Sequence, residues 1–313
     1  DYISRFAASP YFAVTGYVDS YQDIERAIDR RQALIALVIP RDFARDLDRR
    51  EIGQVQLLLD GSDANTATIA LGYAQAVTAE FNSRVLVQRL SSKVALGSGG
   101  LDARVRVWFN EELAAKNYIV PGLIAVIMTI IAALLTSLTV AREWETGTME
   151  LLISTPVTAK ELIVGKTAPY FVIGIIDVIL AMVVAELVFA VPMRGSRLLL
   201  LGLSAVLLVS ALMLGILVSV VAKSQLLASQ LTLLSTALPS FLLSGLMYPI
   251  TNMPQVLQWL TQIVPARYAV SIFKDVCLKG STLAAVSEEL GFLLLFALIL
   301  VVTATAKFKK RLV

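Results

Sequence analysis

The chain has 313 residues, of which 57% are hydrophobic and only 16% are charged, whereas a soluble domain carries about 25% charged residues. It contains no histidine and a single cysteine, Cys277. This composition excludes histidine-based acid–base catalysis, histidine metal ligands, an intrachain disulfide and a cysteine-cluster metal site, and the formal net charge of +3 is too small to indicate a nucleic-acid partner.

The charged residues divide the chain into two regions. Residues 1–117 hold 14 Lys and Arg and 15 Asp and Glu, whereas the much longer region 118–313 holds 13 and 9. The first region is therefore typical of a water-soluble domain and the second of a membrane domain.

The first region alternates strand-like and helical segments. Strand-like apolar runs occupy Tyr11–Val18, Ala33–Ile39 and Val55–Leu59, and charged segments with helical spacing occupy Tyr21–Arg31 and Asp42–Arg50. This alternation predicts a small α/β domain with a mostly parallel sheet.

The rest of the first region predicts a helix, a linker and a strand. Ser62 or Asp63 can cap a long helix that runs to about Leu90. The run Gly97–Gly100 predicts a flexible linker. The alternation of Val105, Val107 and Phe109 with polar or larger residues then predicts a strand that leads back to the membrane.

The second region contains five stretches long and apolar enough to cross a bilayer core of about 30 Å. They are about 118–141, 168–192, 198–222, 226–248 and 290–306. Residues 249–289 hold Pro249, Pro254 and Pro265, so we expect a re-entrant or interfacial hairpin there rather than another span.

The distribution of basic residues predicts the orientation, because their excess marks the cytoplasmic side. One side would carry eight of them, namely Arg142, Lys160, Lys166, Lys223, Lys307, Lys309, Lys310 and Arg311. The other would carry five, namely Arg194, Arg197, Arg267, Lys274 and Lys279. We therefore expect a cytoplasmic C-terminus, and an extracytoplasmic (periplasmic) location for both residues 1–117 and the hairpin 249–289.

This orientation also predicts a further span. A chain that starts in the cytoplasm needs one more membrane crossing before Asp1 to place residues 1–117 outside. We expect six spans in the full-length protein, with the sequence beginning inside a longer chain.

The acidic segment 142–158 is the strongest functional signal. Glu143, Glu145 and Glu150 lie among apolar residues such as Met149 and Leu152 directly after the first span. An amphipathic helix with this many acids is poorly suited to an anionic membrane surface and well suited to a basic groove on a cytoplasmic partner. The alternative is a solvated loop helix without a partner.

A nearby tripeptide resembles the end of a nucleotide-binding loop. Gly165-Lys166-Thr167 matches its last three positions, but the full pattern needs glycine where this chain has Lys160. We therefore predict no ATP site in this chain, and we expect Lys166 to anchor a helix at the membrane interface.

Two acids lie inside the second predicted span. Asp177 is about ten residues into it and Glu186 is nearer its outer end. A charge near the bilayer centre is costly, so Asp177 should face protein or water. Both residues are candidates for the substrate pathway, and the alternatives are helix–helix hydrogen bonding for Asp177 and snorkelling to the interface for Glu186.

The segment after the first span resembles the signature of ABC-2 type permeases, the membrane subunits of ATP-driven exporters. The resemblance is carried by Arg142-Glu143-x-Glu145-x-Gly147-Thr148-Met149-Glu150, then Ser154-Thr155-Pro156-Val157 and Gly165-Lys166. In the first region, Asp60-Gly61-Ser62-Asp63 is similar to the subgroup that works with a periplasmic membrane-fusion adaptor.

The resemblance implies a permease of the bacterial inner membrane that pairs with a second copy or a paralogue. It implies that a cytoplasmic ABC ATPase docks on the coupling helix 142–158 and binds the ATP and Mg, so that this chain is not an enzyme and needs no cofactor. The residues expected at the ATPase contact are Arg142, Glu143, Glu145, Gly147, Thr148, Glu150 and Pro156.

Two questions stay open at this stage. Drugs, other amphiphiles, lipids and glycans all suit the apolar spans as substrates. A non-transporting receptor or scaffold that acts through the extracytoplasmic domain is the alternative function, although a scaffold would not need an acidic docking helix.

Overall fold

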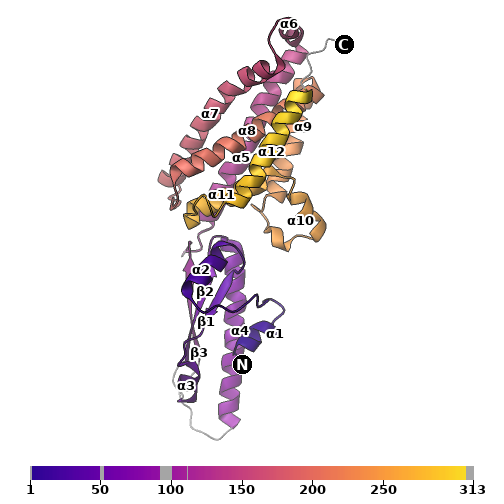
Figure 1. Cartoon of the computed structure of the whole chain (residues 1–313). Helices are drawn as coiled ribbons and strands as arrows, with labels where there is room; N and C mark the ends of the chain where they lie inside the picture. The colour runs from indigo at the N-terminus through magenta and orange to yellow at the C-terminus, as the bar shows by residue number, and fades with distance from the viewer. Residues whose placement is uncertain (1, 50–52, 92–100, 111, 308–313) are drawn as a thin grey trace. The chain divides into compact units, whose positions relative to one another are not determined.

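The computed structural model describes residues 2–49, 53–91, 101–110 and 112–307. It forms two compact units, Asp1–Ala115 and Lys116–Val313 (Figure 1). The expected linker at Gly97–Gly100 and the C-terminal basic residues beyond Lys307 lie outside the described residues. Each unit is described by itself.

The first unit is built on a three-stranded sheet with the order β1-β2-β3. The strands are β1 (Ile35–Val38), β2 (Gly53–Asp60) and β3 (Leu101–Trp108). β2 pairs with β3 in parallel, whereas β1 pairs with β2 antiparallel. The expectation of a mostly parallel sheet is therefore wrong for one of the two pairs. A long crossover is needed for parallel pairing, and only the β2–β3 connection contains a long helix.

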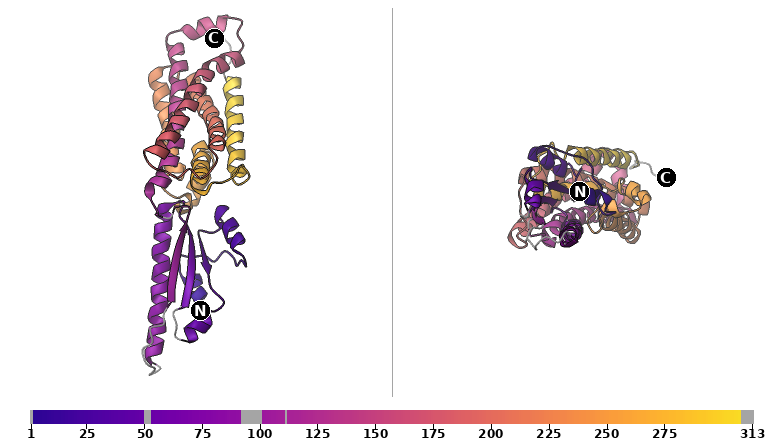
Figure 2. Two further views of the ribbon diagram at one scale, coloured as in Figure 1. Left: turned by 90° about the vertical axis from the view of Figure 1, so that its left-hand side faces the viewer. Right: turned by 90° about the horizontal axis from the view of Figure 1, so that it is seen from below.

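Four helices complete this unit: α1 (Tyr2–Ala8), α2 (Tyr21–Asp29), α3 (Phe43–Asp48) and α4 (Ala64–Ser91). The long α4 runs beside the strands (Figure 2). Asp63 caps it, because its carboxylate accepts hydrogen bonds from the backbone N–H groups of Asn65 and Thr66. This confirms the predicted start of the helix.

Strand β2 is buried on both faces because helices cover each side. Val55 and Leu57 pack with Tyr2 and Phe6 of α1, while Leu58 packs with α2 on the other face, as expected from the alternation of side chains along a strand.

The predicted strand at Tyr11–Val18 is absent, and these residues form an irregular segment. Its larger side chains are exposed, including Tyr11, Val14 and Tyr17. Aromatic and β-branched residues favour a strand only where the fold offers them a pleated, half-buried surface. Residues Tyr11–Val18 do not pair with the sheet and so lack such a surface.

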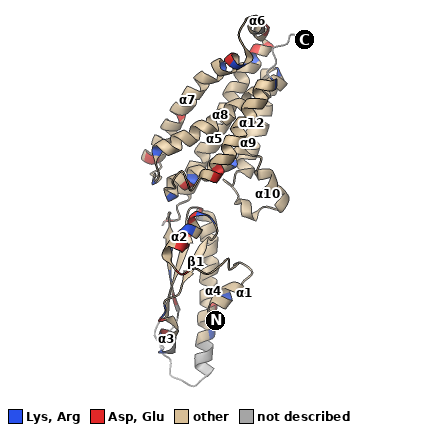
Figure 3. Ribbon diagram, viewed as in Figure 1, with Lys and Arg blue, Asp and Glu red and all other residues tan. Residues whose placement is uncertain are grey.

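The second unit confirms the five predicted spans. Five of its helices are long and apolar enough to cross a membrane: α5 (Ala115–Glu145), α7 (Ala159–Leu187), α8 (Arg197–Ala222), α9 (Gln225–Leu243) and α12 (Ser287–Lys307). Figure 3 shows Lys, Arg, Asp and Glu gathered mainly toward the two ends of these helices.

Helix α8 lies at the centre of this bundle and packs against α7, α9 and α12. Small residues allow close approach. A Cβ at Gly215 of α8 would lie 2.3 Å from the carbonyl oxygen of Ala133 in α5, and one at Gly174 of α7 would lie 2.8 Å from the Leu208 side chain of α8.

Helix α7 begins nine residues earlier than the predicted span. Thr158 and Glu161 form a capping box, in which the Thr158 side chain accepts from the Glu161 N–H and the Glu161 side chain accepts from the Thr158 N–H. The charged first turns of this helix gave no hydropathy signal, so only the cap marks its start.

Residues 249–289 contain two kinds of structure. Helix α10 (Gln255–Thr261) exposes large apolar side chains, including Val256 and Trp259, whereas α11 (Pro265–Lys274) is buried against α8 and α12. Short turns, η1 (Ile250–Asn252) and η2 (Asp275–Lys279), flank these helices. The membrane depth of this segment stays a prediction.

Candidate functional site

The acidic segment 142–158 consists of two helical pieces that meet at a glycine. Helix α5 continues to Glu145, and a second helix, α6, spans Thr148–Ser154. Gly147 between them has φ +72°, a left-handed conformation that glycine adopts without steric penalty. The expected coupling helix is therefore the last turn of α5, a sharp bend and a separate short helix.

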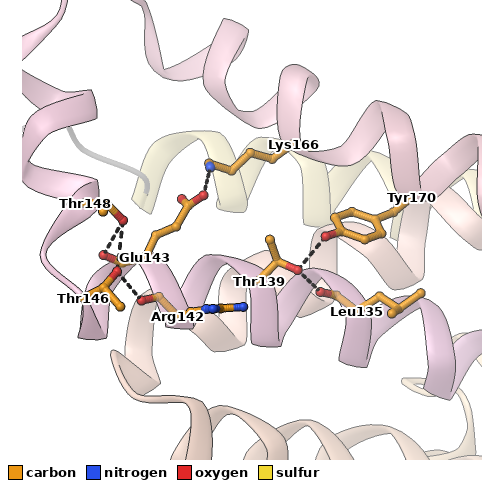
Figure 4. Close-up of polar contacts among 8 residues, drawn as sticks. All are labelled: Leu135, Thr139, Arg142, Glu143, Thr146, Thr148, Lys166 and Tyr170. Atoms are coloured by element: carbon orange, nitrogen blue, oxygen red, sulfur yellow. Dashed lines mark hydrogen bonds and ion pairs between the residues drawn. The ribbon is translucent and has the colours of Figure 1, made fainter.

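Two threonine hydroxyls close this bend, as Figure 4 shows. Thr146 Oγ1 donates to the carbonyl oxygen of Arg142 at 2.9 Å, and Thr148 Oγ1 donates to that of Glu143 at 3.3 Å. The two hydroxyls also lie 3.1 Å apart. The Arg142 carbonyl also accepts from the Thr146 backbone N–H, whereas the Glu143 carbonyl at the end of α5 takes the Thr148 side chain as its partner.

Met149 fastens α6 to the bundle. Its side chain is fully buried in a cluster that α5, α7, α8 and α12 all supply, with the buried members Val140, Ile163, Met213, Ile216 and Ala304. Burying such a side chain stabilises a structure by about 1.5–3 kcal/mol. A displacement of α6 would therefore disturb the packing of four long helices.

The three acids of the segment have different environments. Glu143 forms an ion pair with Lys166 of α7 (Figure 4). Glu145 accepts hydrogen bonds from Gln225, the first residue of α9. Glu150 is exposed on α6, and within the described ranges it makes no ion pair. Only Glu150 of the three therefore has its carboxylate uncommitted.

The remaining residues predicted for partner contact lie near Glu150 in sequence. Arg142, Gly147, Thr148 and Pro156 are exposed, and Leu151 beside Glu150 is 69% exposed. Leu151 was not among the predicted contact residues, and it adds exposed apolar area beside Glu150.

Sequence reasoning also missed the partners of Glu143 and Glu145. It expected Lys166 to anchor a helix at the membrane interface, which stays a prediction, and did not foresee that its ammonium group binds Glu143. It gave Gln225 no role. No local pattern identifies either pairing, because the partners lie 23 and 80 positions apart in the chain.

The two acids of the second predicted span, Asp177 and Glu186, are not brought together. Glu186 forms a two-point ion pair with Arg197, with N–O distances of 2.9 and 3.0 Å, which joins the end of α7 to the start of α8. Asp177 is half-buried beside Gly174 and Val178, which face α8. In the part of the chain that the structure describes, its carboxylate makes no hydrogen bond or ion pair.

Acidic residues and the cysteine do not cluster as metal ligands: no group of three or more is found among the described residues. The assignment of ATP and Mg to a partner protein stays a prediction.

Comparison with known proteins agrees with this architecture. Residues 1–306 match the family described as "ABC-2 family transporter protein". The chain is 35% identical over its whole length to the "Probable multidrug ABC transporter permease YbhS" of Escherichia coli K12, covering 82% of that protein. It is 32% identical over 98% of its length to the "Probable multidrug ABC transporter permease YbhR", again covering 82%.

A third relative in the same organism, the "Inner membrane transport permease YhhJ", is 28% identical over 83% of the chain and 68% of that protein. The match to the family over nearly the whole length, together with five spans and a short helix between the first two, decides the assignment. The chain belongs to the ABC-2 transporter family and is the membrane-embedded permease subunit of an ABC transporter, not its ATPase.

Proposed function

We propose that this permease exports drug-like amphiphiles, driven by a cytoplasmic ABC ATPase that docks on the exposed face of α6. The observation that carries the proposal is the two-sided character of α6: Met149 is buried in the bundle while Glu150 and Leu151 are exposed. A short helix that packs against four long helices on one side and is exposed on the other can transmit the movement of a bound partner to those helices.

The docking face has a definite chemistry. Glu150 supplies an uncommitted negative charge and Leu151 supplies apolar area. Its complement is a groove on the ATPase with basic residues around an apolar floor. ATP and Mg bind to that ATPase, whose closure moves α6 and changes the packing of the long helices.

The wider assembly follows from the relatives. YbhS and YbhR, two permeases of one organism, match this chain to a similar extent, which supports a transporter with two permease subunits, either copies or paralogues. Their names also support multidrug export, and the name of YhhJ supports an inner-membrane location. A cytoplasmic C-terminus and a periplasmic adaptor protein complete the proposal.

The receptor or scaffold alternative no longer has support, since the family assignment makes the chain a transport subunit.

Copurification tests the docking face. The full-length permease is coexpressed with its ATPase, and retention of the ATPase is compared between the wild type and Glu150→Lys or Leu151→Asp. We expect both variants to lose the ATPase while the permease stays folded. Glu288→Lys is the matched control, because Glu288 is also an exposed glutamate near a helix start but lies on another helix. Full ATPase retention by both α6 variants would contradict the proposal.

A further inference from the structure

We propose that the Glu143–Lys166 ion pair carries the motion of α6 into α7, so that these residues are positioning residues for coupling rather than ATPase contacts. The inference rests on the proposed docking at α6 and goes beyond it, because it names the contact through which a movement of α6 is transmitted to the spanning helices. It also gives Glu143 a role different from that of Glu150.

The location of the pair supports this role. Glu143 is in the last turn of α5, four residues before the bend at Gly147, and Lys166 is in the second turn of α7. Thr148, the first residue of α6, donates a hydrogen bond to the carbonyl oxygen of Glu143. Glu143 is therefore bonded to α6 through its backbone carbonyl and to α7 through its side chain.

A second contact fixes the register of the two helices. Thr139 Oγ1 lies 2.7 Å from the Tyr170 hydroxyl, four residues before Glu143 and four residues after Lys166. Four residues are about one helical turn, so the contacts form two rungs between antiparallel helices (Figure 4). Sliding α5 along α7 would break both rungs at once, and the helices are therefore held to move together.

The burial of the pair makes it a firm link. The side chains of Lys166 and Glu143 are only 16% and 24% exposed. Water and salt screen such a partly buried pair less than they screen an exposed pair.

The link between α5 and α9 at the same turn is of the other kind. The Glu145 carboxylate that accepts from Gln225 is exposed, so water and salt compete with this contact. The buried contact beside it involves only small side chains, Ala141 of α5 and Ala228 of α9. On this proposal α6 and α7 move together, and α9 can separate from them at this end.

Two buried polar atoms at the pair support a change of hydrogen-bond partners in the last turn of α5. Within the described residues, neither Oε2 of Glu143 nor Nε1 of Trp144 has a hydrogen-bond partner. Such atoms are rare in a settled structure. A second arrangement of this turn in which they are satisfied would favour the moved position of α6.

The test measures coupling separately from docking. Spin labels are placed on Val164→Cys in α7 and Leu226→Cys in α9, both exposed, in the full-length permease bound to its ATPase. The single native cysteine, Cys277, is buried and stays unlabelled. The change in label distance on trapping with ATP and vanadate reports whether α7 moves relative to α9.

We expect Lys166→Met to keep the ATPase bound and to lose the ATP-dependent distance change, with the trapped population reduced about fivefold or more. The charge swap Glu143→Lys with Lys166→Glu should restore it, as should the conservative Lys166→Arg, which guards against a simple folding defect. Lys160→Met is the matched control: it removes an exposed lysine from the first turn of the same helix and should leave the change intact.

The outcomes separate the two proposals. A full distance change in Lys166→Met with the ATPase bound would overturn the ion-pair role and leave the docking proposal standing. A charge swap that stays uncoupled although Lys166→Arg is coupled would also overturn it, because the pair could not then be the link. Failure of the wild type to retain any ATPase would overturn both.

Discussion

The carboxylate of Glu145 accepts two hydrogen bonds from Gln225, one from its backbone N–H at 3.0 Å and one from its side-chain Nε2 at 3.1 Å. Gln225 is the first residue of α9, where the N–H groups lack helical partners and a negative charge is favoured. An acid in a segment expected to bind a separate protein thus serves as a cap for another helix of the same chain.

Replacing Glu145 by alanine should loosen the start of α9. Without the carboxylate, the amide groups of the first turn of α9 lose an acceptor, so they should exchange with deuterium faster than in the wild type. Hydrogen exchange read by mass spectrometry on the peptide beginning at Ser224 checks this. Glu150→Ala is the control, and equal exchange in both variants would show that the cap has no effect.

Met149 should determine the stability of α6. Because its side chain is fully buried among four helices, Met149→Ala should lower the free energy of unfolding by about 2–5 kcal/mol. Leu151→Ala, at an exposed position two residues away, should leave thermal stability in detergent unchanged while weakening ATPase retention. A similar loss of stability in both variants would contradict the two-sided description of α6.

Lys274 and Tyr118 share one acceptor at the other end of the bundle. The carbonyl oxygen of Gly245 accepts from the Tyr118 hydroxyl at 2.8 Å and from Lys274 Nζ at 3.2 Å, and the ammonium group lies 3.4 Å from the centroid of the Tyr118 ring. Gly245, with φ +78°, turns that carbonyl toward both donors. The arrangement ties α5 and α11 to the turn after α9.

Graded substitutions should rank these contacts. Tyr118→Phe removes one hydrogen bond and keeps the ring, so it should cost about 1 kcal/mol. Lys274→Met removes the other hydrogen bond and the cation–ring attraction, and should cost more, by about 0.5–2 kcal/mol. Unfolding in detergent compares them, and a larger effect for Tyr118→Phe would show that the lysine contributes little.

The only cysteine should be chemically inert in the folded protein. Burial, together with the nearby Glu186 carboxylate, raises the pKa of the Cys277 thiol to about 12. The reactive thiolate is therefore scarce below that pH, and maleimide at pH 8 should modify Cys277 only after unfolding. Leu283→Cys, at an exposed position on the same side of the bundle, provides the reactive control; rapid labelling of Cys277 in the wild type would contradict its burial.

Asp177 should affect transport rather than assembly. Its half-buried carboxylate lies within a spanning helix next to the α7–α8 contact, where a charge is retained at a cost only if it faces water or protein. We expect Asp177→Asn to insert and bind the ATPase normally but to alter transport-coupled ATP hydrolysis. Unchanged ATP hydrolysis in proteoliposomes, with substrate present, would show that Asp177 serves only in helix packing.

The first unit, Asp1–Ala115, shows where local patterns succeed and where they fail. The helix start at Asp63 was predicted because an acid before a helix satisfies neighbouring N–H groups. The strand at Tyr11–Val18 was wrongly predicted: its residues favour strands, but they do not pair with the sheet formed by β1, β2 and β3. The direction of β1 could not be read from composition, because pairing direction depends on how the connecting segment folds.

The membrane unit was more predictable because the bilayer fixes the length and composition of each span. Hydropathy located all five candidate spans found among the described residues. It missed the first turns of α7, where charged residues are helical only because Thr158 and Glu161 cap them.

The sequence by itself determined the family, the five spans and the acidic segment after the first of them, since each is written in contiguous residues whose apolar or charged character acts locally. The tertiary structure decided which two acids, Glu143 and Glu145, pair with other helices of the chain, and that the third, Glu150, is exposed without an ion pair among the described residues. That outcome depends on Lys166 and Gln225, which reach the bend at Gly147 only when α7 and α9 pack beside α5, and such long-range proximity leaves no local trace in the sequence.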